Sequence, residues 1–342
     1  MQTFKNNKKL FGFILLIILL ALVPVFIKSP YYLDLFTILL VNVMIAMTFV
    51  MMLRAGLISL GLATFWGVGA YVSALLVMKV GMSFWLSLPL TAIITAAVAL
   101  LLGLLLVKSG GFTFLILTAV LGMLFVVVVN NIDYVGGATG ISNIPPPNSI
   151  NLPFLPAIEF TSKPALFYLA LFIFVIVLLI VKAFYAAWTG RAWTSIGFNP
   201  RLASSLGISV YKHQLLCFTV ASAIGGLLGS FYAHYQGFIV PVTFSFFVTI
   251  YAQIHAILGG FGYVVMGPLV GAAIMKFVPE FLRIAENISP IIVGTLLIVL
   301  ILFLPRGILG LLDRDAYLGK LWNKFGQKLE AALSNTFKAK KV

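Results

Sequence analysis

The chain has 342 residues, of which 62% are hydrophobic and only 9% are charged. Soluble domains carry about 25% charged residues, so this composition excludes an ordinary soluble protein. The formal net charge of +14 comes from basic residues at the ends of apolar runs and in the connecting segments. That placement is typical of an orientation signal in a membrane protein, and it does not indicate a partner nucleic acid.

Apolar runs recur along the whole chain, and most are about as long as the 20 residues that cross a hydrocarbon core. They do not alternate in polarity, as the strands of a membrane β-barrel would. We therefore predict an all-α polytopic membrane protein with about ten transmembrane helices, of which 57–78 reads as a broken or partial span. The expected spans are 10–27, 33–53, 57–78, 84–107, 112–132, 164–186, 213–236, 241–258, 263–282 and 287–304.

Ten crossings would place both termini on the same side of the membrane. With both termini inside, the basic residues outside would be Lys28, Lys79, Lys163, Lys276 and Arg283, and all the others would be cytoplasmic. Such an excess of Lys and Arg inside predicts an N-in, C-in protein. Five helices in each half would allow a 5+5 inverted repeat, a common plan among transporters. The basic start of the chain leads into an apolar run without a cleavage site, which indicates an uncleaved first helix.

A basic loop at 189–212 separates two of the long apolar runs and contains no acidic residue. Within it, Asn199 suits a helix N-cap, Pro200 the first helical position and Gly207 the left-handed position after the last turn. The intervening "RLASSL" predicts a helix of about two turns, which is too short to be stable alone in water. It must lie against the membrane surface, the rest of the chain or a partner protein.

An outer loop at 133–163 is the one long segment expected on the exterior. Its glycines Gly136, Gly137 and Gly140 allow tight turns, and Pro145, Pro146 and Pro147 favour an extended, ordered backbone. Irregular segments of this length are usually functional or disordered. The loop is therefore either a docking or gating surface or a spacer.

Polar side chains inside apolar spans tend to face a cavity or a pathway. The candidates for a substrate pathway are Asn42, Ser59, Asn130, Gln253 and His255. The chain has no phosphate-binding P-loop and none of the common zinc or serine-hydrolase motifs. The three histidines lie on separate segments and no acid accompanies them, so we expect no metal site.

Several motifs resemble those of LivM-type permeases of the branched-chain amino acid ABC importer family. The first is "GLISLGLATFWGVGAYVSALL" at 56–76, and four others follow in the order of the family. They are "GFTFLILT" (111–118), "GGATGISNIPPP" (136–147), "GRAW…ASSLGI" with "FYAHYQGFIVPVTFSF" (190–246), and "ILGGFGYVVMGPLVGAAI" with "LPRGILGLL" (257–274, 304–312). Together they cover most of residues 33–312.

The resemblance implies an importer in the bacterial cytoplasmic membrane that moves branched-chain amino acids, with no cofactor in this chain. Its partners would be a LivH-like permease, two cytoplasmic ATPases that hold ATP and Mg²⁺, and a periplasmic or lipid-anchored binding protein. The outer loop would receive the binding protein. The basic loop would be the ATPase-coupling element, formed by Arg191, Asn199, Pro200, Arg201, Ala203, Leu206 and Gly207. The family usually has an Asn-Glu pair near the start of that helix, whereas this chain has Asn199-Pro200-Arg201.

Three alternatives stay open on the sequence. Related permeases move urea, short amides or nucleosides, and the chain could share one of those substrates. An autonomous ion-coupled transporter would need carboxylates inside its spans, yet the acids fall at span ends or in loops. A membrane-embedded enzyme would need clustered catalytic groups.

Beyond the permease domain at 1–312, the basic tail 313–342 predicts an amphipathic helix on the anionic inner leaflet.

Overall fold

The computed structural model of the chain describes residues 15–150, 159–281, 294–295, 298, 302 and 307–312. The chain divides into two compact units, Met1–Gln253 and Ile254–Val342. The predicted tail 313–342, most of the predicted span 287–304 and the first residues of the span 10–27 lie outside the described residues. Part of the outer loop, residues 151–158, lies outside them too.

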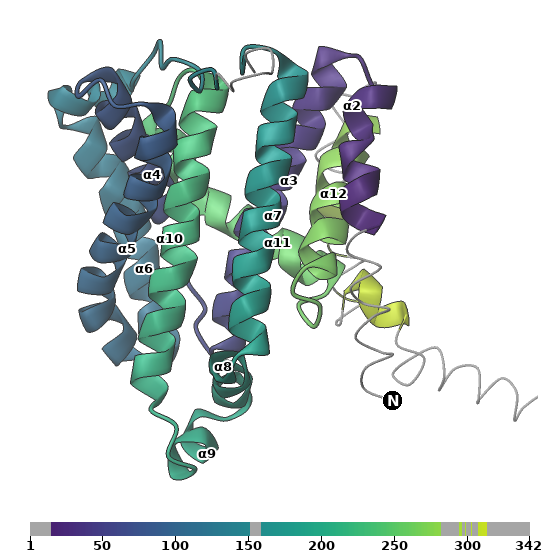
Figure 1. Cartoon of the computed structure of the whole chain (residues 1–342). Coiled ribbons are helices and arrows are strands. Elements are labelled where there is room, and N and C mark those ends of the chain that lie inside the picture. The colour runs from purple at the N-terminus through teal and green to yellow at the C-terminus, as the bar shows by residue number, and fades with distance from the viewer. Residues whose placement is uncertain are drawn as a thin grey trace, which may run out of the picture. The chain divides into compact units, whose positions relative to one another are not determined.

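The first unit is a bundle of upright helices (Figure 1). Five helices of the described chain are long and apolar enough to cross a membrane. They are α3 (Pro30–Arg54), α5 (Phe84–Ser109), α6 (Gly111–Asn130), α7 (Lys163–Ala186) and α10 (Val210–Gln236). Two shorter segments accompany them, Leu15–Phe26, whose last turn is α2 (Val23–Phe26), and α4 (Leu62–Met78). The predicted all-α membrane protein is thereby confirmed.

Two predicted spans are shorter than expected, because apolar composition continues through turns that hydropathy cannot detect. The segment predicted as 241–258 starts with a 3-10 turn, η3 (Pro241–Phe244), and its helix α11 runs only over Phe246–Gly259. The segment predicted as 263–282 forms α12 (Met266–Phe281). In the described residues the β-pairing consists of one isolated bridge, Ile141 with Ile239.

Close approach between α10 and α4 forms the centre of the first unit. A Cβ on Gly229 would overlap the backbone carbonyl of Trp66, and one on Gly69 would overlap the carbonyl of Gly226. The small residues at four-residue spacing on α10 therefore let the two backbones touch, which is how helices pack where hydrophobicity supplies no driving force. Gly103 of α5 packs in the same way against the ring of Phe218.

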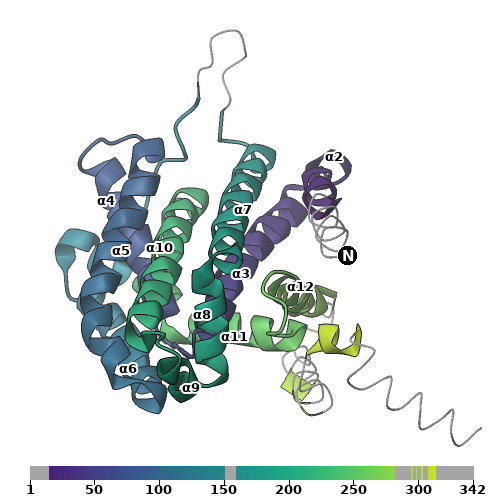
Figure 2. The same cartoon turned by 60° about the horizontal axis from the view of Figure 1, so that its bottom comes forward.

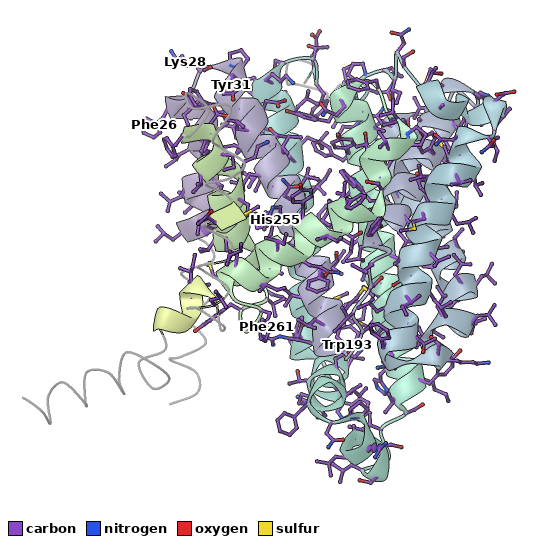
Figure 3. All side chains as sticks on the ribbon, turned by 180° about the vertical axis from the view of Figure 1, so that it is seen from behind. Phe26, Lys28, Tyr31, Trp193, His255 and Phe261 are labelled. Atoms are coloured by element: carbon purple, nitrogen blue, oxygen red, sulfur yellow. The ribbon has the colours of Figure 1, made fainter. Side chains whose placement is uncertain are left out.

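The two ends of this bundle carry different features. At the end where α3 begins, marked by Lys28 and Tyr31 in Figure 3, the carboxylate of Asp34 accepts hydrogen bonds from Lys163 Nζ at 3.0 Å and from the hydroxyl of Tyr235. This cluster joins α3, α7 and α10. At the opposite end, α8 (Trp188–Phe198) and α9 (Pro200–Ser205) lie next to the last turns of α7 and the first turns of α10 (Figures 1 and 2).

The second unit contains the end of α11, α12 and the 3-10 helix η5 (Ile308–Leu312). Glycines set its packing, since a Cβ on Gly271 would overlap the carbonyl of His255 and one on Gly259 would overlap the carbonyl of Gly267. A Cβ on Gly307 would lie 2.4 Å from the backbone of Gly260. The glycine-rich motif at 257–274 thus folds as a tight connection between α11 and α12.

Candidate functional site

The short helix predicted in the basic loop is α9, and its caps are those that the sequence indicates. The side-chain oxygen of Asn199 accepts from the backbone N–H of Arg201 at 3.0 Å and of Leu202 at 3.1 Å. Pro200 is its first residue. Gly207 has φ +81, the left-handed conformation that ends a helix, and its N–H donates to the carbonyl of Ser204 at 3.0 Å.

Before α9 lies a longer helix, α8, which the sequence reading missed. Trp193 anchors it to the bundle (Figure 3), because its indole Nε1 donates to the carbonyl of His213 at 2.8 Å and its ring stacks on Phe184. Gly197 brings α8 against the end of α3, where a Cβ would overlap the carbonyl of Arg54. The coupling segment, residues 189–212, is therefore fixed to α3, α7 and α10.

The outer face of the coupling segment is apolar and basic. Phe198, Leu202 and Leu206 recur every four residues and are 88%, 53% and 73% exposed. Arg191 and Arg201 are also exposed. Of the predicted coupling residues, Ala203 is buried, so it supports α9 from within, while Arg191, Asn199, Pro200, Arg201, Leu206 and Gly207 lie at the surface.

At the opposite end, the outer segment, residues 133–150, turns at the predicted glycines. Gly136, Gly137 and Gly140 all have positive φ, at +87, +53 and +75. A Cβ on Gly140 would overlap the carbonyl of Ile239, which lies in the antiparallel bridge with Ile141. These glycines shape the segment and bring it against the chain that follows α10.

Further hydrogen bonds hold the outer segment to the bundle. Asn148 accepts from the N–H of Phe84 at 2.8 Å through its side chain and from Trp85 Nε1 at 3.0 Å through its carbonyl. Lys79 donates to the carbonyl of Tyr134 at 2.8 Å and lies over its ring. Of the three prolines predicted for docking, Pro145 and Pro146 are exposed and Pro147 is buried.

The partial span predicted at 57–78 is a shortened helix that follows a stretch of irregular backbone. After α3 ends, residues 55–61 run without helix into the interior, and α4 starts only at Leu62. We call residues 55–61 the break. Irregular backbone at membrane depth must find partners or line a cavity.

Side chains from other helices supply partners for the backbone of the break and of the first turn of α4. The N–H of Ala63 donates to Thr249 Oγ1 at 2.9 Å, and that of Leu60 to Thr118 Oγ1 at 3.1 Å. Gln214 Nε2 donates to the carbonyl of Ala55 at 3.0 Å. The break is thus a polar junction of α4 with α6, α10 and α11.

The structure brings together two of the five predicted pathway residues. Gln253 Nε2 donates to the carbonyl of Ser59 at 3.0 Å, inside the break. Asn42 is half-buried on α3, and Asn130 is exposed at the end of α6. His255 follows on α11 but belongs to the second unit.

A second polar cluster escaped the sequence reading. Ser73 Oγ of α4 lies 2.7 Å from Ser230 Oγ, 3.1 Å from Ser87 Oγ and 3.1 Å from His234 Nε2. All four residues are buried. Its only sequence signal is that these polar residues interrupt apolar spans, and no spacing rule could pair them across α4, α5 and α10.

Comparison with known proteins identifies the family. Residues 31–304 match the family described as the permease component of the branched-chain amino acid transport system. Two relatives are the high-affinity branched-chain amino acid transport system permease proteins LivM of Salmonella typhimurium and Escherichia coli. Each is 27% identical over 316 residues, which cover 87% of this chain and 74% of the relative. No solved structure matches.

The match covers the outer segment, the break and the coupling segment, and it confirms the resemblance drawn from the motifs. It also identifies a transport subunit rather than an enzyme. The chain therefore belongs to the branched-chain amino acid transport system permease family and is a multi-pass membrane permease component of that ABC transporter family.

Proposed function

We propose that this chain is the permease subunit through which branched-chain amino acids enter a bacterial cell, driven by separate ATPase subunits. The exposed surface of the coupling segment supports this proposal above all. Phe198 ends α8, and Leu202 and Leu206 lie on or next to α9; we call these three exposed apolar side chains the row, and Trp193 fixes the segment that carries them to the bundle. An apolar row of this kind that remains exposed favours a protein partner.

The chemistry of the row indicates what the partner offers. Arg191 on α8 and Arg201 on α9 are exposed on the same two helices, and the stretch 189–212 contains no acid. A complementary surface would combine an apolar groove with acidic side chains. The cytoplasmic ATPases, which would hold ATP and Mg²⁺, are the partners that the family implies, and their closure would push on α9.

The proposed assembly contains further partners. A LivH-like permease would pair with this chain in the membrane, and a periplasmic or lipid-anchored binding protein would dock on the outer segment through the exposed Pro145 and Pro146. We propose ten crossings, with both termini in the cytoplasm and a 5+5 inverted repeat. The five long apolar helices of the described residues support the multi-pass part of this proposal. ATP binding would then shift the bundle between inward-open and outward-open states.

The test is reconstitution of the importer with its ATPases and binding protein, followed by leucine uptake and ATP hydrolysis. Leu202→Asp and Leu206→Asp place a charge on the row. Ser204→Asp places the same charge on another face of α9 and serves as the control. We expect the first two variants to lose at least about tenfold of the substrate-stimulated ATP hydrolysis, since a desolvated, unpaired charge costs several kcal/mol at an interface, and the control to retain it.

Normal stimulation in both row variants would contradict the assignment of the coupling segment. Uptake of urea or a short amide in place of leucine would contradict the proposed substrate while leaving the assembly intact. Transport by the chain reconstituted alone would instead support the autonomous, ion-coupled reading.

A further inference from the structure

Three polar atoms on α4 are buried and have no hydrogen-bond partner among the described residues. They are Thr64 Oγ1, Trp66 Nε1 and Tyr71 Oη, and their side chains are only 3%, 5% and 4% exposed. Most buried polar groups in native proteins are paired, and an unpaired one costs free energy. The concentration of three on one helix therefore requires a reason.

Their position supplies a reason, because all three follow the break. Transporters commonly bind their substrates where a membrane helix is interrupted near the middle of the bilayer. The break ends at Gly61, and Thr64, Trp66 and Tyr71 occupy the next three turns of α4. They lie between the break and Lys79, which contacts the outer segment.

One side chain contacts the rings of two of these three residues. Phe244, at the end of η3, is fully buried, and its ring centroid lies 5.0 Å from that of Trp66 and 6.1 Å from that of Tyr71. Phe125 of α6 and Tyr232 of α10 complete the ring cluster, at 6.2 Å from Tyr71 and 4.7 Å from Trp66. A Cβ on Gly67 would lie 2.8 Å from Phe244 Cβ, so the packing is tight.

The segment that carries Phe244 is tied to the outer segment. It begins at Gly237, which has φ +75 and accepts from the N–H of Ile144 at 2.9 Å through its carbonyl. Ile239 follows and forms the antiparallel bridge with Ile141. Movement of the outer segment would therefore shift the backbone that leads to Phe244.

We propose that Thr64, Trp66 and Tyr71 form the intramembrane contact site for the transported amino acid, and that Phe244 occupies this site in the closed state. This inference rests on the proposed function and specifies its substrate contacts. An indole N–H only donates, so the ligand must present an acceptor to Trp66, and the two hydroxyls can donate to the same group. The carboxylate of an aliphatic amino acid does so, while the ring faces of Phe125 and Tyr232 suit its apolar side chain.

The ammonium group of the ligand is also accommodated. Trp and Tyr ring faces attract cations, and the cluster contains Trp66, Tyr71 and Tyr232. The site needs no charged side chain, because neutral donors on a carboxylate are stronger in a low-dielectric environment than in water. Urea would satisfy the donors but would leave the aromatic walls without an apolar partner.

The experiment uses the complete importer in proteoliposomes, with a saturating excess of leucine-loaded binding protein. Tyr71→Phe removes only the hydroxyl, and Thr64→Val replaces only the hydroxyl by a methyl group of similar size. Thr91→Val is the matched control, because Thr91 Oγ1 on α5 is also buried and without a partner among the described residues. Leucine uptake, ATP hydrolysis and the unfolding temperature of the solubilised complex are measured for each.

We expect Tyr71→Phe and Thr64→Val each to reduce leucine uptake about tenfold, the effect of one lost hydrogen bond to a charged group. ATP hydrolysis stimulated by the binding protein should stay within about twofold, because the docking surfaces are unchanged. The unfolding temperature should not fall, since neither atom has an internal partner to lose. Thr91→Val should change none of the three.

Two results would overturn the site. If both variants take up leucine as fast as the unmodified importer, the atoms do not contact the substrate. If uptake, hydrolysis and unfolding temperature all fall together, the atoms have a role in packing instead. If the unmodified importer takes up no leucine, the proposed substrate fails and this inference fails with it. If the unmodified importer takes up leucine and the variants do so equally well, only the proposed site is contradicted and the proposed function stands.

Discussion

The Nδ1 atom of His234 on α10 lies 2.7 Å from the carbonyl oxygen of Pro145 in the outer segment. A carbonyl only accepts, so Nδ1 carries the proton in this contact. The other ring nitrogen, Nε2, lies 3.1 Å from Ser73 Oγ on α4 and accepts from it in the neutral ring. One imidazole therefore joins the outer segment to two helices of the bundle.

Replacing this ring should loosen the outer segment. His234→Leu keeps a buried side chain of comparable size but removes both hydrogen bonds, each of which contributes about 1 kcal/mol. We expect amide hydrogen exchange over residues 141–148 to accelerate by about tenfold. Ser73→Ala, which leaves the bond to Pro145 in place, should accelerate it less. Exchange that is the same in His234→Leu and the unmodified protein would show that the remaining contacts suffice.

The end of α9 provides a second prediction. Gly207 has φ +81, which proline cannot adopt and asparagine tolerates, and its N–H donates to Ser204. Gly207→Pro should therefore abolish substrate-stimulated ATP hydrolysis while the protein still accumulates in the membrane. Gly207→Asn should retain most of the stimulation. Full stimulation in the proline variant would mean that the shape of α9 is unimportant for coupling.

Two glycines on α10 should respond in opposite ways to the same substitution. A Cβ on Gly229 would overlap the carbonyl of Trp66, whereas one on Gly225 would lie 3.6 Å from its nearest neighbours. Gly229→Ala should lower the unfolding temperature of the solubilised protein by about 5 °C or more, because the helices must separate. Gly225→Ala should leave it unchanged or raise it slightly, since Ala favours a helix by up to about 1 kcal/mol. Equal effects would refute the close approach at Gly229.

The docking surface on the outer segment is testable with one charge. Pro146 is exposed and lies between the residues that fix the segment to the bundle. Pro146→Glu should raise the binding-protein concentration needed for half-maximal leucine uptake by about fivefold or more, because charged mismatches weaken docking. Val80→Glu, at the same end of the bundle but outside the segment, serves as the control. An unaltered requirement in Pro146→Glu would indicate that the segment is a spacer.

Local signals in the sequence predicted the local structure well. Asn199, Pro200 and Gly207 each have one conformational role, and together they placed α9 and its ends correctly. The glycines at 136, 137 and 140 likewise predicted turns that the structure contains. In each case the information lies within a few residues of the feature.

Features that depend on distant partners could not be predicted in this way. The backbone of the break at 55–61 and of the α4 turn that follows it is satisfied by Thr118, Gln214 and Thr249, which lie far along the chain. The cluster around Ser73 draws on α5 and α10 in the same manner. The helix α8 was missed because its anchor, the bond from Trp193 to the carbonyl of His213, is invisible in the periodicity of its own residues.

The contact between Gly197 of α8 and the carbonyl of Arg54 gives the coupling segment a short mechanical route to the interior. Arg54 is the last residue of α3, and the next residue, Ala55, opens the break and is held by Gln214 of α10. In the proposed coupling role, a force on α9 would reach the non-helical residues between α3 and α4 through this contact. Work performed at the cytoplasmic surface would arrive directly at the irregular backbone beside Ser59 and Gln253.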